Sequence, residues 1–412
     1  MTSVRLFLAR CPFLIQFGQQ KRQQKRQRNG VIRVGLLLLG LLLPMGCQPV
    51  DSADSDSANS DATATAEHAI RRAVFESQSA QIPTAQLPPS PLSPAMTASI
   101  AQFDFASDFS EGLAAVKLSD RYAYINRTGQ VVITVEEGLD GVSGFSEQRA
   151  IVRVSDLYGY IDQSGKIVVD PQYASANSYS QGLAVIRTGR GYGYLDRAGQ
   201  LATDPEFTLA DDFSEGLAAV KRNDQYGYIN LMGDWVIRPQ FQDAWRFAES
   251  LAVVKVDSQW GYLDRAGNVA INPQFDGAFS FSESRARVRQ GSQWGFIDPQ
   301  GKMAIAPQFD FASDFAQERA AVLVGSKWGY VDPAGKLTIA PQFDYATDFS
   351  EGLAAVKVGN QMGFIDRTGR MQIEPQFENV GSFSEGWAWV QNGEQWRYVD
   401  SNGNFLERSA VQ

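Results

Sequence analysis

Cysteine and histidine are nearly missing from this chain of 412 residues, which holds only Cys11, Cys47 and His68. Because all three lie in the first 68 residues, the rest of the chain has no thiolate or imidazole to bind zinc or to form a nucleophile–base pair. Neither a phosphate-binding Walker loop nor a glycine-rich dinucleotide fingerprint occurs. We therefore expect no enzymatic activity, no catalytic residues, no cofactor and no metal site.

Positive charge is scarce beyond the N-terminal region. Residues 1–47 hold eight of the 37 Lys and Arg and no Asp or Glu, which leaves 29 basic and 46 acidic residues, a net charge of −17, for the remainder. Such a surface repels phosphate backbones, so nucleic acid is excluded as a partner. Cationic surfaces or neutral ligands fit this charge better.

Long hydrophobic runs are also rare, and the one that stands out covers residues 34–46. At about 1.5 Å per residue this run spans roughly 20 Å, less than the roughly 30 Å hydrocarbon core of a membrane. Basic residues precede the run and Cys47 follows it, which is the layout of a signal peptide. We interpret residues 1–46 as a leader, in which residues 1–30 reflect a misassigned start.

The end of this leader resembles the lipobox of bacterial lipoproteins, with Gly46 directly before Cys47. The resemblance implies acylation of Cys47 and anchoring to the cell envelope through an N-terminal lipid, in the outer membrane if the cell is Gram-negative. Pro44 and Met45 depart from the usual Leu and small residue. The alternative is an ordinary signal peptide or an uncleaved anchor, and a secreted or periplasmic protein.

Residues 47–101 are poor in aromatic residues and rich first in Asp, Ser and Ala and then in Pro. A segment of this composition cannot bury enough apolar surface to order itself, and its proline-rich part favours an extended chain. We predict a disordered tether.

Residues 102–412 consist of a sequence repeat. An aromatic anchor recurs at a step of 36 residues once and 34 residues seven times, and a second aromatic series, Phe109 through Phe383, keeps the same step. The anchors are Tyr122, Tyr158, Tyr192, Tyr226, Trp260, Trp294, Trp328, Met362 and Trp396. Nine units of about 34 residues therefore cover the chain after the tether.

Each unit predicts three β-strands and no helix. In the unit from Phe247 to Phe275, short β-prone runs alternate with turn residues. A polar stretch of about four residues separates the first two strands, and Asp264 to Gly267 has the pattern of a type I turn followed by a left-handed residue. Pro273 then ends the third strand, as proline does in seven units. The fold class is all-β.

The motifs Trp-Gly-Tyr-Leu-Asp, Pro-Gln-Phe-Asp and Phe-Ser-Glu-Gly-Leu-Ala-x-Val-Lys resemble the bacterial WG repeat, also called the KWG repeat, over residues 103–412. The resemblance implies a repeat module without a common catalytic activity. Tyr replaces Trp in the first four units and Met362 replaces it in the eighth. An insertion around residues 136–138 removes the first proline.

Three sets of residues have both a functional and a structural interpretation. The Asp or Asn that opens each turn, such as Asp264, is interpreted as a turn cap rather than a metal ligand. Seven glutamates at unit spacing are interpreted as capping or solvated rather than as a glycosidase pair. The aromatic anchors are interpreted as core, with exposed platforms for glycans as the alternative. The seven glutamates are Glu111, Glu147, Glu215, Glu249, Glu283, Glu351 and Glu385.

The arrangement of the units follows from the glycine after each anchor. Glycine stands there in the seven internal units but not in the first and last, where Ala123 and Arg397 replace it. Glycine within a strand marks close approach of another backbone, so its absence only at the ends favours an open, solenoid-like array over a closed propeller. We expect an envelope-tethered, non-catalytic scaffold that binds a protein or cell-envelope component; a glycan-binding module is the alternative.

Overall fold

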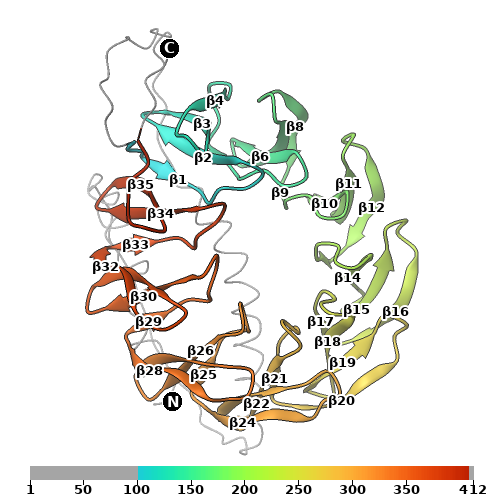
Figure 1. The fold of residues 1–412 in the computed structure, drawn as a ribbon. Helices are drawn as coiled ribbons and strands as arrows, with labels where there is room; N and C mark the ends of the chain where they lie inside the picture. Colours follow the sequence, from blue (N-terminus) through green and yellow to red (C-terminus); the bar gives the residue numbers. More distant parts are fainter. Residues whose placement is uncertain (1–100, 408–412) are drawn as a thin grey trace, which may run out of the picture. The chain divides into compact units, whose positions relative to one another are not determined.

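The computed structural model describes residues 101–407. The predicted leader, the predicted lipidation site Cys47 and the predicted tether up to residue 100 lie outside the described residues. Within residues 101–407 the chain forms nine antiparallel sheets, each built from strands consecutive in sequence. Figure 1 shows these sheets following one another around a ring, so that each sheet is one blade of a β-propeller.

Each blade begins with a two-residue inner strand, which the sequence analysis did not predict. A six- or five-residue second strand pairs with it. The inner strands are β1 (Phe105–Ala106), β5 (Gly141–Val142), β9 (Ser175–Ala176), β13 (Leu209–Ala210), β17 (Asp243–Ala244), β21 (Gly277–Ala278), β25 (Phe311–Ala312), β29 (Tyr345–Ala346) and β33 (Asn379–Val380). The second strands are β2 (Leu113–Leu118), β6 (Arg149–Val154), β10 (Leu183–Thr188), β14 (Leu217–Arg222), β18 (Leu251–Val256), β22 (Ala286–Gln290), β26 (Ala320–Val324), β30 (Leu353–Val358) and β34 (Trp387–Asn392).

The third strand carries the aromatic anchor, and the fourth lies on the outside of the ring (Figure 1). The third strands are β3 (Arg121–Asn126), β7 (Leu157–Asp162), β11 (Gly191–Asp196), β15 (Gln225–Asn230), β19 (Gln259–Asp264), β23 (Gln293–Ile297), β27 (Lys327–Val331), β31 (Gln361–Asp366) and β35 (Gln395–Asp400). The fourth strands are β4 (Val131–Thr134), β8 (Ile167–Tyr173), β12 (Leu201–Phe207), β16 (Trp235–Phe241), β20 (Val269–Phe275), β24 (Met303–Phe309), β28 (Leu337–Phe343) and β32 (Met371–Phe377). Eight blades therefore have four strands instead of the predicted three, and the ninth has the three strands β33, β34 and β35.

The core lies between neighbouring blades. The middle strands β18 and β19 are buried on both faces, because each sheet packs against the sheet before it and the sheet after it. One apolar cluster joins the fourth and fifth blades, with Tyr228 and Ile237 on one side and Phe247 and Val254 on the other. The apolar runs of the second and third strands therefore fill both faces of a layered ring.

The predicted open array is wrong, because the chain closes the ring. Phe103, before the first blade, pairs with Trp396 in the ninth, and the backbone N–H of Ala101 donates to the carbonyl of Leu406 at 3.0 Å. Phe103 is thus the antiparallel strand partner of Trp396, as Phe275 is the partner of Trp260 in the fifth blade. The N-terminal residues of the repeat region complete the outer edge of the last blade.

The close backbone approach at the glycines that follow the anchors lies within one blade, so the glycine pattern does not distinguish an open array from a closed ring. A Cβ on Gly261 would lie 2.6 Å from the carbonyl oxygen of Ile271 and 2.6 Å from the nitrogen of Pro273, both in the outer strand of the same blade. Residues 272–274 of the outer strand lie opposite the single residue Gly261, which makes a β-bulge. Ala123 and Arg397 are allowed because the outer edges of their blades lack this proline bulge.

The prediction that the proline ends its strand is also wrong. Pro273 lies inside β20, which continues to Phe275. It is tolerated because β20 is an edge strand, where the missing N–H faces no partner. The loop between the second and third strands is shorter than predicted, since only Asp257 and Ser258 separate β18 from β19. Both residues have positive φ, as a type I′ hairpin turn requires.

Candidate interaction surface

The ring presents two faces with different chemistry, because antiparallel strands in sequence order place their connections alternately at the two strand ends. One face, here called the clamp face, carries the Ser-Glu-Gly turns before the second strand and the Asp-x-x-Gly turns after the third. The other, here called the hairpin face, carries the two-residue loops between the second and third strands and the corners that lead into the next blade.

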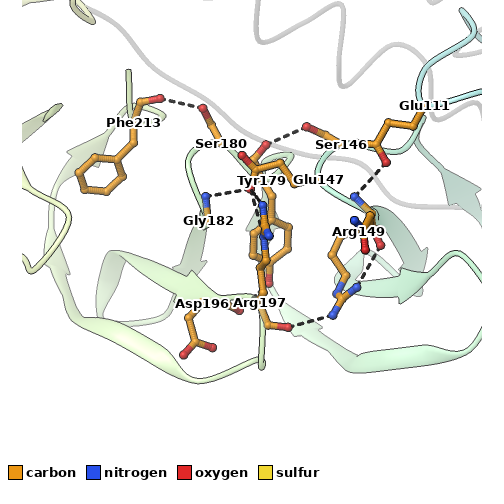
Figure 2. Close-up of polar contacts among 11 residues, drawn as sticks. Glu111, Ser146, Glu147, Arg149, Tyr179, Ser180, Gly182, Asp196, Arg197 and Phe213 are labelled. Atoms are coloured by element: carbon orange, nitrogen blue, oxygen red, sulfur yellow. Dashed lines mark hydrogen bonds and ion pairs between the residues drawn. The ribbon is translucent and has the colours of Figure 1, made fainter. Parts of the chain in front are cut away.

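On the clamp face, each blade holds the turn of the next blade by a side chain. Glu147 accepts a hydrogen bond from the backbone N–H of Gly182 at 2.8 Å and from Nη2 of Arg197 at 2.7 Å, as Figure 2 shows. Equivalent contacts to the following turn are made by Glu111, Gln181, Glu215, Glu249, Glu283, Gln317, Glu351 and Glu385. The capping interpretation of the glutamates is confirmed, with Gln181 and Gln317 as members that the sequence analysis missed.

These glutamates occupy an unfavourable backbone conformation. Glu111 and Gly112 have φ of 54° and 79°, and Ser110 and Leu113 exchange both backbone hydrogen bonds around them, which defines a type I′ turn. Asn or Gly is preferred at the first of these positions, and a longer side chain there costs about 1 kcal/mol. Glu and Gln are long enough to reach the next blade, so the contact between blades offsets the strain.

A second set of polar contacts runs around the same face. The hydroxyl of Ser146 donates to the carbonyl of Tyr179, and that of Ser180 to the carbonyl of Phe213 (Figure 2). Seven serines make this bond at 2.7–2.8 Å: Ser110, Ser146, Ser180, Ser214, Ser282, Ser350 and Ser384. Ala248 and Ala316 hold the same position in the fifth and seventh blades.

The environment of Glu147 favours its charged form, which suits a structural contact and not proton donation. Burial raises the pKa of Glu147, but hydrogen bonds from Arg197 and from the backbone of Gly182 and Gln181 outweigh it, so the pKa is lowered overall. A general acid needs a raised pKa, so that it still carries a proton it can donate near neutral pH. This carboxylate is therefore unsuited to that role.

The turn residues also behave as predicted from sequence. Oδ1 of Asp264 accepts hydrogen bonds from the backbone N–H of Ala266 and Asn268, and Gly267 has φ of 88°. The same pair of bonds occurs at all nine turns, beginning with Asn126 and ending with Asp400. Among residues 101–407 no group of three His, Cys, Asp or Glu is placed to hold a metal ion. The same residues include no helix long and apolar enough to cross a membrane.

The aromatic anchors lie in the core near the hairpin face. Trp260 and Trp294 are 1% and 5% exposed, whereas Trp328 and Trp396 are partly exposed. Two residues after each anchor, a fully buried Tyr or Phe packs on the member of the second aromatic series, Phe109 through Phe383, in the next blade, as Tyr228 does on Phe247 at a ring distance of 5.0 Å. The core interpretation therefore holds for Trp260 and Trp294, whereas Trp328 reaches the surface.

A run of aromatic rings that the sequence analysis missed crosses the fifth to eighth blades. Successive ring centroids lie 5.0–6.2 Å apart along Trp260, Trp245, Phe279, Trp294, Phe311, Trp328 and Tyr345. Phe311 and Tyr345 are the first residues of the inner strands β25 and β29. The sequence predicted no strand at this position of the unit, so it did not indicate where these two rings lie. Tyr345, 46% exposed, brings the run to the surface.

Arg287 carries a buried charge that is paired directly across a blade interface. It is 4% exposed, its Nε lies 2.8 Å from Oδ1 of Asp314, and its Nη1 donates to the carbonyl of Ala312. Its guanidinium lies 3.5 Å from the ring centre of Phe279. These contacts join the sixth and seventh blades beneath the aromatic run.

A closed ring of nine blades, with each interface held by the same turn contacts, defines a β-propeller scaffold. The family model of the WG containing repeat matches nine successive segments, at residues 100–122, 122–158, 158–190, 192–226, 226–260, 260–294, 294–328, 328–361 and 362–396. The chain belongs to this family of repeat proteins. A comparison with curated protein sequences found no match.

Solved structures resemble the chain in fold alone. The eukaryotic initiation factor in one crystal structure is 10% identical, with a TM-score of 0.53 over 74% of this chain and 95% of that one. The WD40 domain of SCAP from fission yeast is 8% identical, with a TM-score of 0.39 over 75% of this chain and 98% of that one. PorZ, a bacterial surface component of the type-IX secretion system of Porphyromonas gingivalis, is 11% identical, with a TM-score of 0.30 over 76% and 52%.

Proposed function

We propose that this protein is a non-catalytic binding scaffold anchored to the cell envelope through a lipid on Cys47. The observation that carries the scaffold part is the use of the turn glutamates. Glu147 and its counterparts are the most obvious acid–base candidates in the repeats, and each is bonded to the backbone of the next blade. Their contacts support a structural role for the clamp face, which leaves the hairpin face for partners.

The anchoring part is supported by the sequence alone. The 13-residue apolar run ends at Gly46 and Cys47, and the segment that follows is rich in Asp, Ser and Pro. A lipid at Cys47 and an extended segment would hold the ring away from the membrane, where a protein partner of the envelope can reach it.

Mass spectrometry of the mature N-terminus tests the anchor. We expect a diacylated or triacylated Cys47, with Gln48 next, and a Cys47→Ser variant that no longer partitions with membranes. An unmodified Cys47 still joined to Gly46 would show that the protein is not a lipoprotein.

Affinity capture from the envelope of the producing cells, followed by direct binding measurements with each purified candidate, tests the scaffold. We expect saturable binding of a protein. A glycan array provides the opposite test, because specific glycan binding that is lost in a folded Trp328→Leu variant would establish the glycan-binding alternative. Trp328 is the informative site because Trp260 and Trp294 are buried.

A further inference from the structure

The hairpin face repeatedly places a cation over an aromatic ring. The second-strand residue paired directly with the anchor is Lys or Arg in seven blades, and in five of them its charged group lies 5.3–6.0 Å from the centre of the anchor ring. The five pairs are Lys117 with Tyr122, Arg187 with Tyr192, Lys221 with Tyr226, Lys255 with Trp260 and Arg289 with Trp294. Such contacts are favourable because the ring face is electron-rich.

The seventh blade lacks this cation. Leu323 pairs with Trp328, and within residues 101–407 no Lys or Arg side chain lies over the Trp328 ring. Trp328 is partly exposed, in contrast to the covered rings of Trp260 and Trp294. In the ninth blade Gln391 is likewise neutral, but there the Trp389 ring packs on Trp396 at 4.7 Å.

Two further aromatic rings flank Trp328. Phe311 lies 5.8 Å from it and Tyr345 lies 6.0 Å from it, both edge-on, so the three rings form a row along the hairpin face. Leu323 adds an aliphatic side chain in register with Phe311 and Trp328. The row is therefore partly exposed and rich in π-electrons. Cations already flank its two outer rings, since the guanidinium of Arg287 lies 5.4 Å from the centre of the Phe311 ring and Lys357 pairs with Tyr345.

Carboxylates stand beside the row. Asp310 precedes Phe311 and accepts a hydrogen bond through Oδ2 from the backbone N–H of Gly325 at 2.6 Å. Asp344 precedes Tyr345 and accepts from Nζ of Lys327 and from the backbone N–H of Gly359. The corner position of these aspartates is acidic in the sixth to ninth blades but neutral in the third to fifth, where Ala174, Thr208 and Gln242 stand. The row therefore lies in the acidic sector of this face.

We propose that the Trp328 row, comprising Phe311, Leu323, Trp328 and Tyr345, is the docking site for a Lys- or Arg-bearing segment of a partner protein. The partner's cation lies over Trp328, where the second-strand cation lies in the sister blades, and the apolar side chains beside it pack on Phe311 and Tyr345. The net negative charge of the mature chain and the corner carboxylates complement such a segment. This inference rests on the proposed scaffold function and names its partner class.

The test uses Leu323→Lys, which restores the residue type that the first, fourth, fifth and eighth blades carry at this position. The matched control is Val324→Lys, which adds the same charge one residue later, at a 43% exposed position on the opposite face of β26. The probe is a labelled peptide of alternating Leu and Lys, and its lysine-acetylated form is the neutral reference. Binding is followed by fluorescence polarisation and by the indole N–H signals of the full chain in mild detergent.

We expect the peptide to shift the Trp328 indole signal and leave that of Trp260 in place. Leu323→Lys should weaken binding roughly tenfold, as loss of one cation–π contact and added repulsion require, while Val324→Lys should bind within about twofold of the unaltered chain. Equal binding of the acetylated peptide, equal binding by Leu323→Lys, or no shift at Trp328 would each overturn the inference. If the unaltered chain and Leu323→Lys capture the same envelope partner equally well, the Trp328 site is refuted and the scaffold function is kept. If neither chain captures any protein, the scaffold function itself is refuted.

Discussion

Glu385 in the ninth blade accepts a hydrogen bond from the backbone N–H of Gly112 in the first, through Oε2 at 2.9 Å. The same oxygen accepts from Nη2 of Arg127 at 2.8 Å. Glu147 makes the same two contacts between the second and third blades. The seam between the last blade and the first is therefore built from the contacts that join internal blades.

This equivalence predicts that Glu385→Ala and Glu147→Ala destabilise the protein equally. Each removes a charge-assisted bond to a turn amide and an exposed ion pair, and each should lower the free energy of unfolding by about 1–2 kcal/mol. Urea unfolding of both variants measures this. A cost for Glu147→Ala with none for Glu385→Ala would mean that the ring is open at the seam in solution.

The serine contacts predict a stabilising substitution. Ala248 holds the position from which seven serines donate to the next blade's carbonyl, so Ala248→Ser should add one hydrogen bond, to the carbonyl of Phe281. The expected gain is about 0.5–1 kcal/mol, the net value of a partly buried hydrogen bond. Ser214→Ala, the reverse change one blade earlier, should cost a similar amount in the same unfolding experiment. A loss of stability in Ala248→Ser would contradict the expected geometry.

The repeat, its nine units and the Asp-x-x-Gly turns were predictable because each depends on local residue preference. Asp264 and Gly267 specify their turn without help from the rest of the fold. The two-residue inner strands were not predictable, because Phe311 and Ala312 are too few to form a pattern and are β only through pairing with β26.

Closure could have been predicted from one segment. Gln102, Phe103 and Asp104 repeat the Gln-Phe-Asp that ends the outer strand of other units, so the repeat region begins with the end of a blade whose other strands lie at the C-terminus. Ala123 and Arg397 favoured an open array only because sequence spacing does not show which backbone approaches a glycine. The Trp328 row has the same limitation: Leu323 departs visibly from Lys, but its meaning depends on its pairing with Trp328.

The proline bulge predicts different responses at two equivalent positions. Gly261→Ala places a Cβ against the backbone of Ile271 and Pro273, so it should destabilise the protein by about 2–4 kcal/mol. Ala123 occupies the same position in the first blade, where the outer strand stays in register beside it. Ala123→Gly should therefore cost only about 0.5–1 kcal/mol, because glycine loses more backbone entropy on folding. Thermal unfolding compares the two. A mild effect of Gly261→Ala would show that the outer strand yields easily.

Asp212 predicts how stability depends on pH. Burial, and then the neighbouring Asp211 carboxylate, raise the pKa of Asp212 from 3.8 to about 6, against the opposing influence of Asn177 and Arg246. Because the folded pKa exceeds the unfolded value, the stability that the neutral acid provides is complete below pH 3.8 and is lost as the pH rises through 6.

The turn carboxylate Asp264 responds to pH in the opposite direction. Hydrogen bonds from the side chain and backbone of Asn268, and from the turn amides of Ala266 and Gly267, lower the pKa of Asp264. Its contribution is present above the unfolded value and is lost as the pH falls below about 4. The sum of these two contributions is therefore greatest near pH 4, since the first declines as the pH rises toward 6 and the second declines below about pH 4.

Asp212→Asn separates the two effects. The amide keeps a polar contact with Asn177, which donates to Asp212 at 2.9 Å, but does not ionise. The variant should be more stable than the unaltered chain at pH 7, by on the order of 1 kcal/mol, and indistinguishable from it at pH 4. Urea midpoints at pH 7, 6, 5 and 4 measure the difference. Equal stability of the two chains at pH 7 would show that Asp212 ionises at its ordinary pKa and that burial does not penalise its charge.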